Sequence, residues 1–354
     1  MPTACRTLAA TAVLAGLMAL AGCGASGSDA AADAPQTAPG TSPPAPSAPG
    51  AATGTPVTLA FAGDTHFERQ LTDGRIGGMR EQLGAADLAM INMETAVTGR
   101  GTPVGKQFVF RGPASALQGL LDSGVDVVTV ANNHGMDYGQ TGLLDTLDAA
   151  KAAGLPLVGA GIDQATAYAP YRTTVKGQRL ALFGATQVLD NSVKAAWTAG
   201  PDKPGLASAY EVETLLSSVR DAREDSDTVV VFLHWGVERS ACPPPQAKTL
   251  AQQLVDAGAD VVVGSHAHVL LGDGRLGNAY VHYGLGNFQF YNGSGATAAT
   301  GVLTLTVQGR RTISAAFEPG IMRNGRPEPL TGSARATALT QREQRRACTG
   351  LDAP

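Results

Sequence analysis

Carboxylate, amide and imidazole side chains recur in this sequence in short motifs, each directly after an apolar run. The apolar run at 57–62 precedes Asp64, and the run at 228–233 precedes His234. The set comprises Asp64, His66, Glu94, Asn133, His134, His234, His266 and His268. Carboxylate and amide oxygens with imidazole nitrogens form a mixed ligand set for zinc, manganese or iron. The residue types therefore predict a site for one or two divalent metal ions.

Histidine usage strengthens this prediction. The chain has six histidines, and all except His282 lie in these motifs. A lone histidine is more often a packed polar side chain, and His282, inside a predicted strand, is expected to be one. Five histidines at strand ends are not expected by chance. No set of cysteines accompanies them, which excludes a structural cysteine–zinc site.

An alternation of strands and helices must position these motifs. Apolar strands are predicted at 57–62, 87–91, 126–131, 179–185, 228–233, 260–264, 280–283, 301–307 and 312–317, and helices at 115–123, 140–153, 209–224 and 246–257. This pattern favours an α/β fold with largely parallel sheets covered by helices. Because ligands bind at the carboxyl ends of strands in open α/β sheets, the fold is expected to gather the motifs.

The motifs, taken in order, resemble those of the CapA family, the bacterial poly-γ-glutamate capsule biosynthesis proteins, which are a branch of the calcineurin-like metallophosphoesterases. The resemblance rests on Gly63-Asp64-Thr65-His66, Asn92-Met93-Glu94, Ala131-Asn132-Asn133-His134-Gly135-Met136-Asp137-Tyr138-Gly139, His234-Trp235-Gly236-Val237-Glu238, Gly264-Ser265-His266-Ala267-His268-Val269 and Tyr283-Gly284-Leu285-Gly286-Asn287-Phe288. It runs from about Val57 to Phe290. It implies a metallophosphoesterase-like four-layer α/β/β/α sandwich, with the folded domain at 57–320.

The resemblance also implies a two-metal centre. The first metal would be bound by Asp64, His66 and His268, and the second by Asn133, His234 and His266. Glu94 stands where the bridging carboxylate is expected. Glutamate there replaces the usual aspartate, and its longer side chain would shift the bridge between metals whose spacing governs phosphoryl transfer. His66, by contrast, restores a ligand that many CapA relatives lack.

His134 follows the amide ligand, where the superfamily has its general acid. Its implied role is to protonate a leaving group or to stabilise a transition-state oxygen. Asp137 could orient that imidazole, because a buried carboxylate raises its basicity and fixes its tautomer. Alternatively, Asp137 is the N-cap of the helix predicted from Gln140.

Further candidates flank the predicted metal site. Glu238 could contact substrate or the surroundings of the metal. Asn287 could bind a ligand through a hydrogen bond or simply shape its turn. Lys106 and Arg111 could each bind an anionic substrate, and Arg111 is the favoured one because Lys106 is expected on a solvated loop.

The N-terminus is predicted to be a targeting segment. Residues 1–23 contain Arg6, an apolar run and Leu20-Ala21-Gly22-Cys23, which resembles the bacterial lipobox. Cleavage before Cys23 and its lipidation would hold the protein on the extracytoplasmic face of the cell membrane. The alternative is an ordinary signal peptide with an incidental cysteine. Residues 24–56 have no aromatic residue and no Val, Ile or Leu, so a disordered tether is predicted.

The remaining cysteines, Cys242 and Cys348, could form a disulfide in an oxidising exterior, and we favour that bond over two free thiols. The polar tail at 321–354 is expected to be peripheral, with Arg342, Arg345 and Arg346 on a solvated face. The formal net charge of −4 shows no basic stripe, so nucleic acid is not an expected partner.

Two functions are compatible with these features. The first is an extracytoplasmic metal-dependent hydrolase of a phosphoester or of a γ-linked amide in a capsule or cell-envelope polymer. The second is a non-catalytic factor that uses metals to assemble, export or anchor an anionic surface polymer, in contact with other capsule-synthesis proteins. Glu94 favours the second function, and His66 with His134 favours the first.

Overall fold

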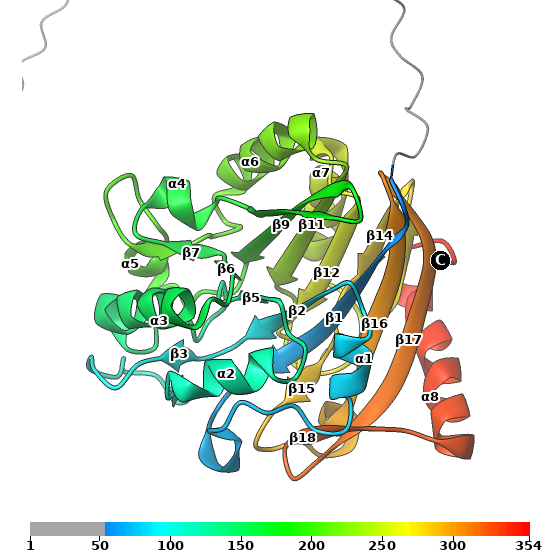
Figure 1. Cartoon of the computed structure of the whole chain (residues 1–354), viewed down its shortest axis with the longest axis horizontal. Coiled ribbons are helices and arrows are strands. Elements are labelled where there is room, and N and C mark those ends of the chain that lie inside the picture. Colours follow the sequence, from blue (N-terminus) through cyan, green and yellow to red (C-terminus); the bar gives the residue numbers. More distant parts are fainter. Residues whose placement is uncertain (1–53) are drawn as a thin grey trace, which may run out of the picture. The chain divides into compact units, whose positions relative to one another are not determined.

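Two β-sheets lie at the centre of the structure, a computed structural model that describes residues 54–354 (Figure 1). The predicted signal peptide, the lipidation of Cys23 and the predicted tether as far as residue 53 lie outside the described residues. No helix within 54–354 has the length and apolar character needed to cross a membrane.

The larger sheet has eight strands in the order β18-β17-β16-β1-β2-β5-β6, with β15 also paired to β1. Its strands are β1 (Val57–Thr65), β2 (Leu88–Met93), β5 (Val127–Thr129), β6 (Leu157–Val158), β15 (Asn287–Gln289), β16 (Ala299–Gln308), β17 (Arg311–Arg323) and β18 (Arg326–Pro329). The pairs among β1, β2, β5, β6 and β15 are parallel. β16, β17 and β18 pair antiparallel because short turns connect them in sequence.

The smaller sheet has six strands in the order β13-β14-β12-β11-β9-β8. These strands are β8 (Tyr171–Val175), β9 (Gln178–Thr186), β11 (Thr228–His234), β12 (Val261–Ser265), β13 (Asp273–Leu276) and β14 (Ala279–His282). The four central strands are parallel, and the two edge strands are antiparallel. The prediction of largely parallel sheets therefore holds for the smaller sheet except its two edge strands. In the larger sheet it holds for β15, β1, β2, β5 and β6 and fails for β16, β17 and β18.

The sheets pack face to face, and helices cover their outer faces. Leu59 and Phe61 of β1 belong to the same buried cluster as Val230 and Phe232 of β11. The larger sheet is covered by α1 (Arg80–Gly84), α2 (Ser115–Leu121) and α3 (Gly139–Ala153), and the smaller sheet by α6 (Val212–Asp225) and α7 (Pro245–Ala257). The predicted four-layer α/β/β/α sandwich is confirmed (Figure 1).

Nine short elements and the helix α8 complete the described part of the chain. They are η1 (Arg69–Leu71), β3 (Ala96–Val97), β4 (Arg111–Gly112), β7 (Ala160–Gly161), α4 (Gln164–Ala167), α5 (Lys194–Trp197), β10 (Gly205–Leu206), η2 (Gly295–Ala298), α8 (Gly332–Arg345) and η3 (Arg346–Cys348). The domain boundary predicted at residue 320 falls inside β17. The predicted tail includes β18, α8, which lies beside β17 (Figure 1), and η3.

The expectation of a solvated arginine cluster in the tail is wrong for Arg342 and Arg346. Arg342 donates to both carboxylate oxygens of the buried Asp273, over 2.9 and 2.6 Å, and the Tyr280 hydroxyl donates to the same carboxylate. Arg346 Nε donates to the carbonyl oxygen of Asp273 over 2.7 Å. We call Asp273, Tyr280, Arg342 and Arg346 the C-terminal latch. The sequence hides it because Asp273 and Arg342 are 69 positions apart.

A disulfide joins the tail to the loop after β11. Cys242 and Cys348 are bonded, with their Cα atoms 5.7 Å apart. The same loop carries Glu238, so the bond ties the end of the chain to a segment that borders the predicted site.

Candidate metal centre

The predicted donor residues lie where neighbouring strands end. Asp64, near the end of β1, is in register with Asn92 of β2 and Asn287 of β15. His234 ends β11 and is in register with Ser265, the last residue of β12. Parallel strands bring these ends to one edge of each sheet. The two packed sheets thereby gather residues that are far apart in the sequence.

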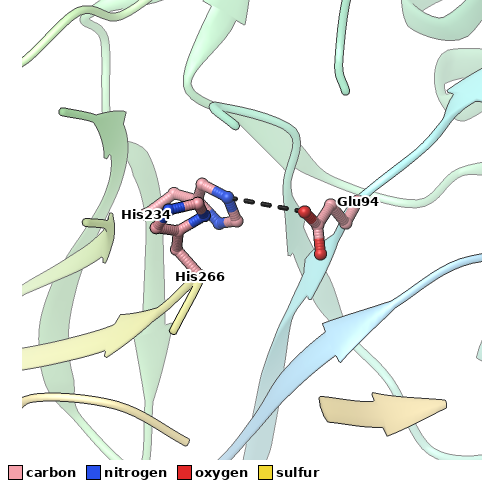
Figure 2. A group of neighbouring side chains, drawn as sticks. All are labelled: Glu94, His234 and His266. Carbon is pink, nitrogen blue, oxygen red and sulfur yellow. Dashed lines mark ion pairs between the residues drawn. The ribbon is translucent and has the colours of Figure 1, made fainter. Parts of the chain in front are cut away.

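Three groups of side chains could each hold a metal ion. They are Glu94 with His234 and His266, Asp64 with Glu94 and His268, and Glu238 with His266 and His268. Within each group, one donor atom per residue lies within 4.8 Å of the others. Figure 2 shows the first group, in which the Glu94 carboxylate points toward the His234 ring and the His266 ring lies beside it.

Glu94 is completely buried, and neither of its carboxylate oxygens has a hydrogen-bond partner among the described residues. Its Oε1 lies 3.5 Å from His234 Nε2 (Figure 2) and 3.8 Å from His134 Nε2. Burial, and next the charge of Asp64, raise the pKa of Glu94 well above its ordinary value. An unpaired buried carboxylate is unfavourable unless a cation compensates it. This orphaned group therefore fits a metal ligand.

Burial favours the neutral form of His234 and His266, which is the form that binds metals. His234 Nε2 lies 2.7 Å from Asn133 Oδ1, and burial lowers the pKa of His234 well below its ordinary value. Burial likewise lowers the pKa of His266 to about 3. A neutral imidazole keeps one nitrogen lone pair for a ligand. Asn133, His234 and His266 thus lie together, as the sequence predicted.

His268 lies between two carboxylates. Its Nδ1 is 2.7 Å from Asn287 Oδ1 and 3.3 Å from Asp64 Oδ2. Burial opposes protonation of His268, but the charges of Glu94 and Asp64 prevail and raise its pKa to about 10. The carboxylates therefore attract positive charge to this position, which a divalent cation can supply. Asn287 contacts His268 and can orient its ring. The sequence had left open whether Asn287 binds a ligand or only shapes its turn.

The backbone at His266 and His268 is left-handed, with φ of 88° and 56°. Such conformations cost on the order of 1–3 kcal/mol in a residue other than glycine, and they concentrate at functional sites. The His266 N–H donates to the Asp64 carboxylate, 3.2 Å from Oδ2, which helps hold this turn.

Two residues that sequence reasoning missed support the donors. Asn92 Nδ2 donates to Asp64 Oδ1 over 2.8 Å, and Asn92 Oδ1 accepts from Asn132 Nδ2 over 3.0 Å. Asn132 Oδ1 in turn accepts from the backbone N–H of His134 over 2.9 Å. The available signal was the presence of asparagines beside the donors in the Asn-Met-Glu and Asn-Asn-His motifs.

The predicted acid, His134, is held by a carboxylate. Its Nδ1 lies 2.7 Å from Asp137 Oδ2, and Tyr138, not Asp137, is the N-cap of α3. Asp137 is fully buried and pairs with Lys106, whose Nζ lies 2.5 Å from Oδ1. Burial lowers the pKa of His134, and the hydrogen bond and charge of Asp137 oppose that shift.

Two predicted residues are not brought to the donors. His66 Nε2 lies 3.1 Å from the backbone N of Tyr291, and its ring packs near Phe110 and Phe290 with centroid distances of 4.9 and 4.2 Å. Arg111 is exposed, and its guanidinium lies over the Tyr138 ring. The preference for Arg111 over Lys106 is therefore not supported, because Lys106 is the cation that reaches the site.

A cavity of about 420 Å³ opens beside the donors. Its lining includes His134, Glu238, Arg239, His268, Asn287, Phe108, Phe110, Phe290 and Tyr291. Arg239 forms no ion pair with any residue in 54–354. The cavity thus combines an aromatic wall with a free positive charge next to the candidate metal centre.

Comparison with known families matches residues 58–292 to the family described as "Bacterial capsule synthesis protein PGA_cap". The chain is 33% identical over 221 residues to "Capsule biosynthesis protein CapA" of Bacillus anthracis, which covers 61% of this chain and 53% of that one. It is 33% identical over 213 residues to "PGA biosynthesis protein CapA" of Bacillus subtilis (strain 168), covering 59% and 54%. The chain thus spans about half the length of these curated relatives.

Solved structures with a similar arrangement include a putative 5'-nucleotidase from Staphylococcus aureus and a 5'-nucleotidase from Candida albicans. The first has 15% identity and a TM-score of 0.43, covering 81% of this chain and 58% of that one. The second has 11% identity and a TM-score of 0.45, covering 83% and 59%. No chemistry of this chain is inferred from similarities of this size.

Proposed function

Because the chain belongs to the family of bacterial capsule synthesis proteins, we propose that it is a metal-dependent hydrolase acting on an anionic capsule or cell-envelope polymer. A poly-γ-glutamate-like chain is the substrate suggested by the relative named as a PGA biosynthesis protein. The reaction proposed is addition of water across a phosphoester or a γ-linked amide.

The observation that carries the proposal is the buried, unpartnered carboxylate of Glu94 among imidazoles. The proposed donors are Asp64, Glu94, Asn133, His234, His266 and His268. His66 is left out because a backbone N–H lies against each of its ring nitrogens. When bound, divalent cations such as Mn²⁺, Zn²⁺ or Fe²⁺ polarise the scissile bond and make water a stronger nucleophile.

His134 is proposed to move the proton. Asp137 accepts from Nδ1 of the imidazole, which leaves Nε2 facing the donors and free to exchange a proton. As water adds, one proton leaves the water and one is delivered to the departing oxygen or nitrogen, so the imidazole ends unchanged. Lys106 holds Asp137 and thereby fixes this orientation.

Anionic substrates fit the charges around the cavity. Arg239 lines it, and Lys106 lies beside the proposed acid. The aromatic side chains Phe110, Phe290 and Tyr291 can pack against the methylene groups of a polymer backbone. A free guanidinium above an apolar wall suits a chain whose carboxylates alternate with such groups.

Anchoring by lipid at Cys23 on the extracytoplasmic face of the membrane is part of the proposal. Its support is the Leu-Ala-Gly-Cys motif after an apolar run, together with the Cys242–Cys348 disulfide, which suits an oxidising compartment. Mass spectrometry of the membrane fraction should detect a diacylated N-terminal cysteine. A soluble secreted product cleaved elsewhere would contradict this part.

Hydrolysis is tested with the purified full chain loaded with Mn²⁺ or Zn²⁺, using γ-glutamyl peptides and model phosphodiesters. His134→Gln keeps the size of the side chain but not its acid, and should lower kcat by roughly 10²–10⁴-fold with metal content unchanged. Equal activity of His134→Gln and wild type would remove the assigned acid. Inactivity of the metal-loaded wild type on both substrates would overturn the hydrolase.

A second candidate function is non-catalytic binding of the polymer through metal ions. One observation favours it: Glu94 Oε1 lies only 3.8 Å from Nε2 of His134, where a leaving group would have to approach. A carboxylate this close to Nε2 leaves less room for a leaving group, which suits a binding site better than a reactive one. Polymer binding that needs metal but proceeds without cleavage would support this function.

A further inference from the structure

Glu238 brings a third carboxylate to the solvent side of the metal donors. It lies on the loop after β11 and, unlike Asp64 and Glu94, is exposed. A carboxylate oxygen of Glu238 and one ring nitrogen each of His266 and His268 lie within 4.8 Å of one another. Glu238 and His268 also line the cavity, so this group faces the space where substrate is expected.

His266 provides an independent sign that this group receives a ligand. The residue is only 5% exposed, its Nδ1 is buried without a partner, and neither ring nitrogen is hydrogen-bonded to any residue in 54–354. Buried polar atoms are normally satisfied, so an imidazole without partners among other donors indicates a missing ligand. His266 belongs both to the inner group of Glu94 and His234 and to the outer group of Glu238 and His268.

The loop of Glu238 is fixed against the histidines. The backbone N of Arg239 donates to the carbonyl oxygen of Ala267 over 2.7 Å, and Ala267 separates His266 from His268. The disulfide of Cys242 holds the far end of the same loop. The backbone beside Glu238 is therefore held by the segment that carries His266 and His268.

Charge also favours a third carboxylate. Asp64 and Glu94 bring two negative charges to the two buried donor groups, whereas two divalent cations carry four positive charges. Asp137 cannot make up the difference, because it already pairs with Lys106 and His134. Excess positive charge in a buried site is unfavourable. Among the described acidic residues outside the inner groups, Glu238 is the one that approaches the donor histidines.

We propose that Glu238 is a metal ligand that closes the site from the cavity side, together with His266 and His268. The Glu238 carboxylate lies near both histidines, so it would add an oxygen ligand to the existing centre and leave a position open to the cavity, as in catalytic metal sites. Glu238 supplies the protein ligand that His66, turned toward Tyr291, does not. This inference deepens the proposed function and rests on its metal centre.

The test is equilibrium binding of Zn²⁺ to the metal-free full chain, measured by competition with a chromophoric chelator. Glu238→Gln removes the charge and the ligand at nearly constant size, and Glu238→Asp keeps a carboxylate. Glu224→Gln is the matched control, since Glu224 is exposed on α6 and does not line the cavity. The visible spectrum of the Co²⁺-loaded proteins reports the coordination independently of activity.

Glu238→Gln should lower the affinity for the most weakly bound Zn²⁺ by at least about tenfold and change the Co²⁺ spectrum. Glu238→Asp should recover part of the affinity, and Glu224→Gln should match wild type. Wild-type affinity and spectrum in Glu238→Gln would overturn the ligand role while leaving the inner centre intact. Absence of Zn²⁺ binding by wild type would overturn both proposals. If Glu238→Gln weakens Zn²⁺ binding but the wild-type protein cleaves neither substrate, the ligand role of Glu238 stands and only the hydrolase proposal fails.

Discussion

Two buried carboxylates, Asp273 and Glu94, have opposite surroundings. Asp273 receives two hydrogen bonds from Arg342 and one from Tyr280. Burial favours the neutral acid, but His282, Arg342 and Tyr280 together hold the pKa of Asp273 below its ordinary value. Glu94 has no hydrogen-bond donor within 54–354, and its pKa is raised. The chain completes the first site by itself. Glu94 lacks a counter-charge unless a cation binds. This difference distinguishes a structural buried carboxylate from a functional one.

The disulfide beside the latch gives the largest expected effect. It links residues 106 positions apart, and the double variant Cys242→Ser, Cys348→Ser should lose about 4 kcal/mol of unfolding free energy. Urea unfolding of the metal-free protein measures this loss, with the reduced wild type as the matched comparison. Binding of Zn²⁺ by the inner donors should persist in the double variant. A complete loss of binding there would show that latch and metal centre are not separate.

Asp273→Asn should destabilise the metal-free protein by about 3 kcal/mol, because Arg342 is left largely buried without its counter-charge. Its Zn²⁺ affinity should stay at the wild-type value. Glu343→Gln on the exposed side of α8 is the control and should lie within about 0.5 kcal/mol of wild type. A stability like that of the control would mean that the latch is incidental.

Glu94→Gln should show the opposite pattern. Its Zn²⁺ affinity should fall by about 100-fold, which corresponds to roughly 2.7 kcal/mol. Its unfolding free energy without metal should equal that of wild type or exceed it by up to about 1 kcal/mol, because an unpaired buried carboxylate has been removed. Chelator competition and urea unfolding in EDTA measure the two quantities on one sample. Destabilisation as large as that of Asp273→Asn would erase the contrast between the two carboxylates.

The smallest expected effect is a pH dependence of the latch. The pKa of Asp273 is lower in the folded protein than its ordinary value of 3.8. The folded state therefore binds fewer protons, and the contribution of Asp273 is present above pH 3.8 and lost as the pH falls through the folded pKa. Unfolding free energy should fall more steeply with acid in wild type than in Asp273→Asn. Parallel curves would contradict the assigned ion pair.

Strand ends were the predictable part of the metal site. Apolar runs before Asp64, Glu94 and His234 mark buried strands, and parallel pairing then brings their ends together. The direction of a side chain is not set by its place after a strand. His66 follows β1 yet turns into an aromatic pocket, because Phe110 and Phe290 from later segments pack around its ring.

The latch was unpredictable for a related reason. No residue of α8 is fully buried, and its sequence has the polar pattern of a surface helix. The side chain of Arg342 nevertheless reaches inward, and its partner lies on β13. Lys106 shows the same limit, since nothing beside it in the sequence signals the carboxylate of Asp137. Pairings of single charges over long sequence separations leave no periodic signal.

The Cys242–Cys348 bond also determines what a protease can release. It encloses His266 and His268, two of the three proposed donor histidines, and the exposed turn at 292–296 on the cavity rim. A single cut in that turn leaves two fragments that remain covalently joined, so neither donor histidine can be shed with a fragment. Such a nicked chain would migrate as one band in electrophoresis until a thiol is added. The bond thus keeps the chain in one covalent piece after a single break in this exposed turn.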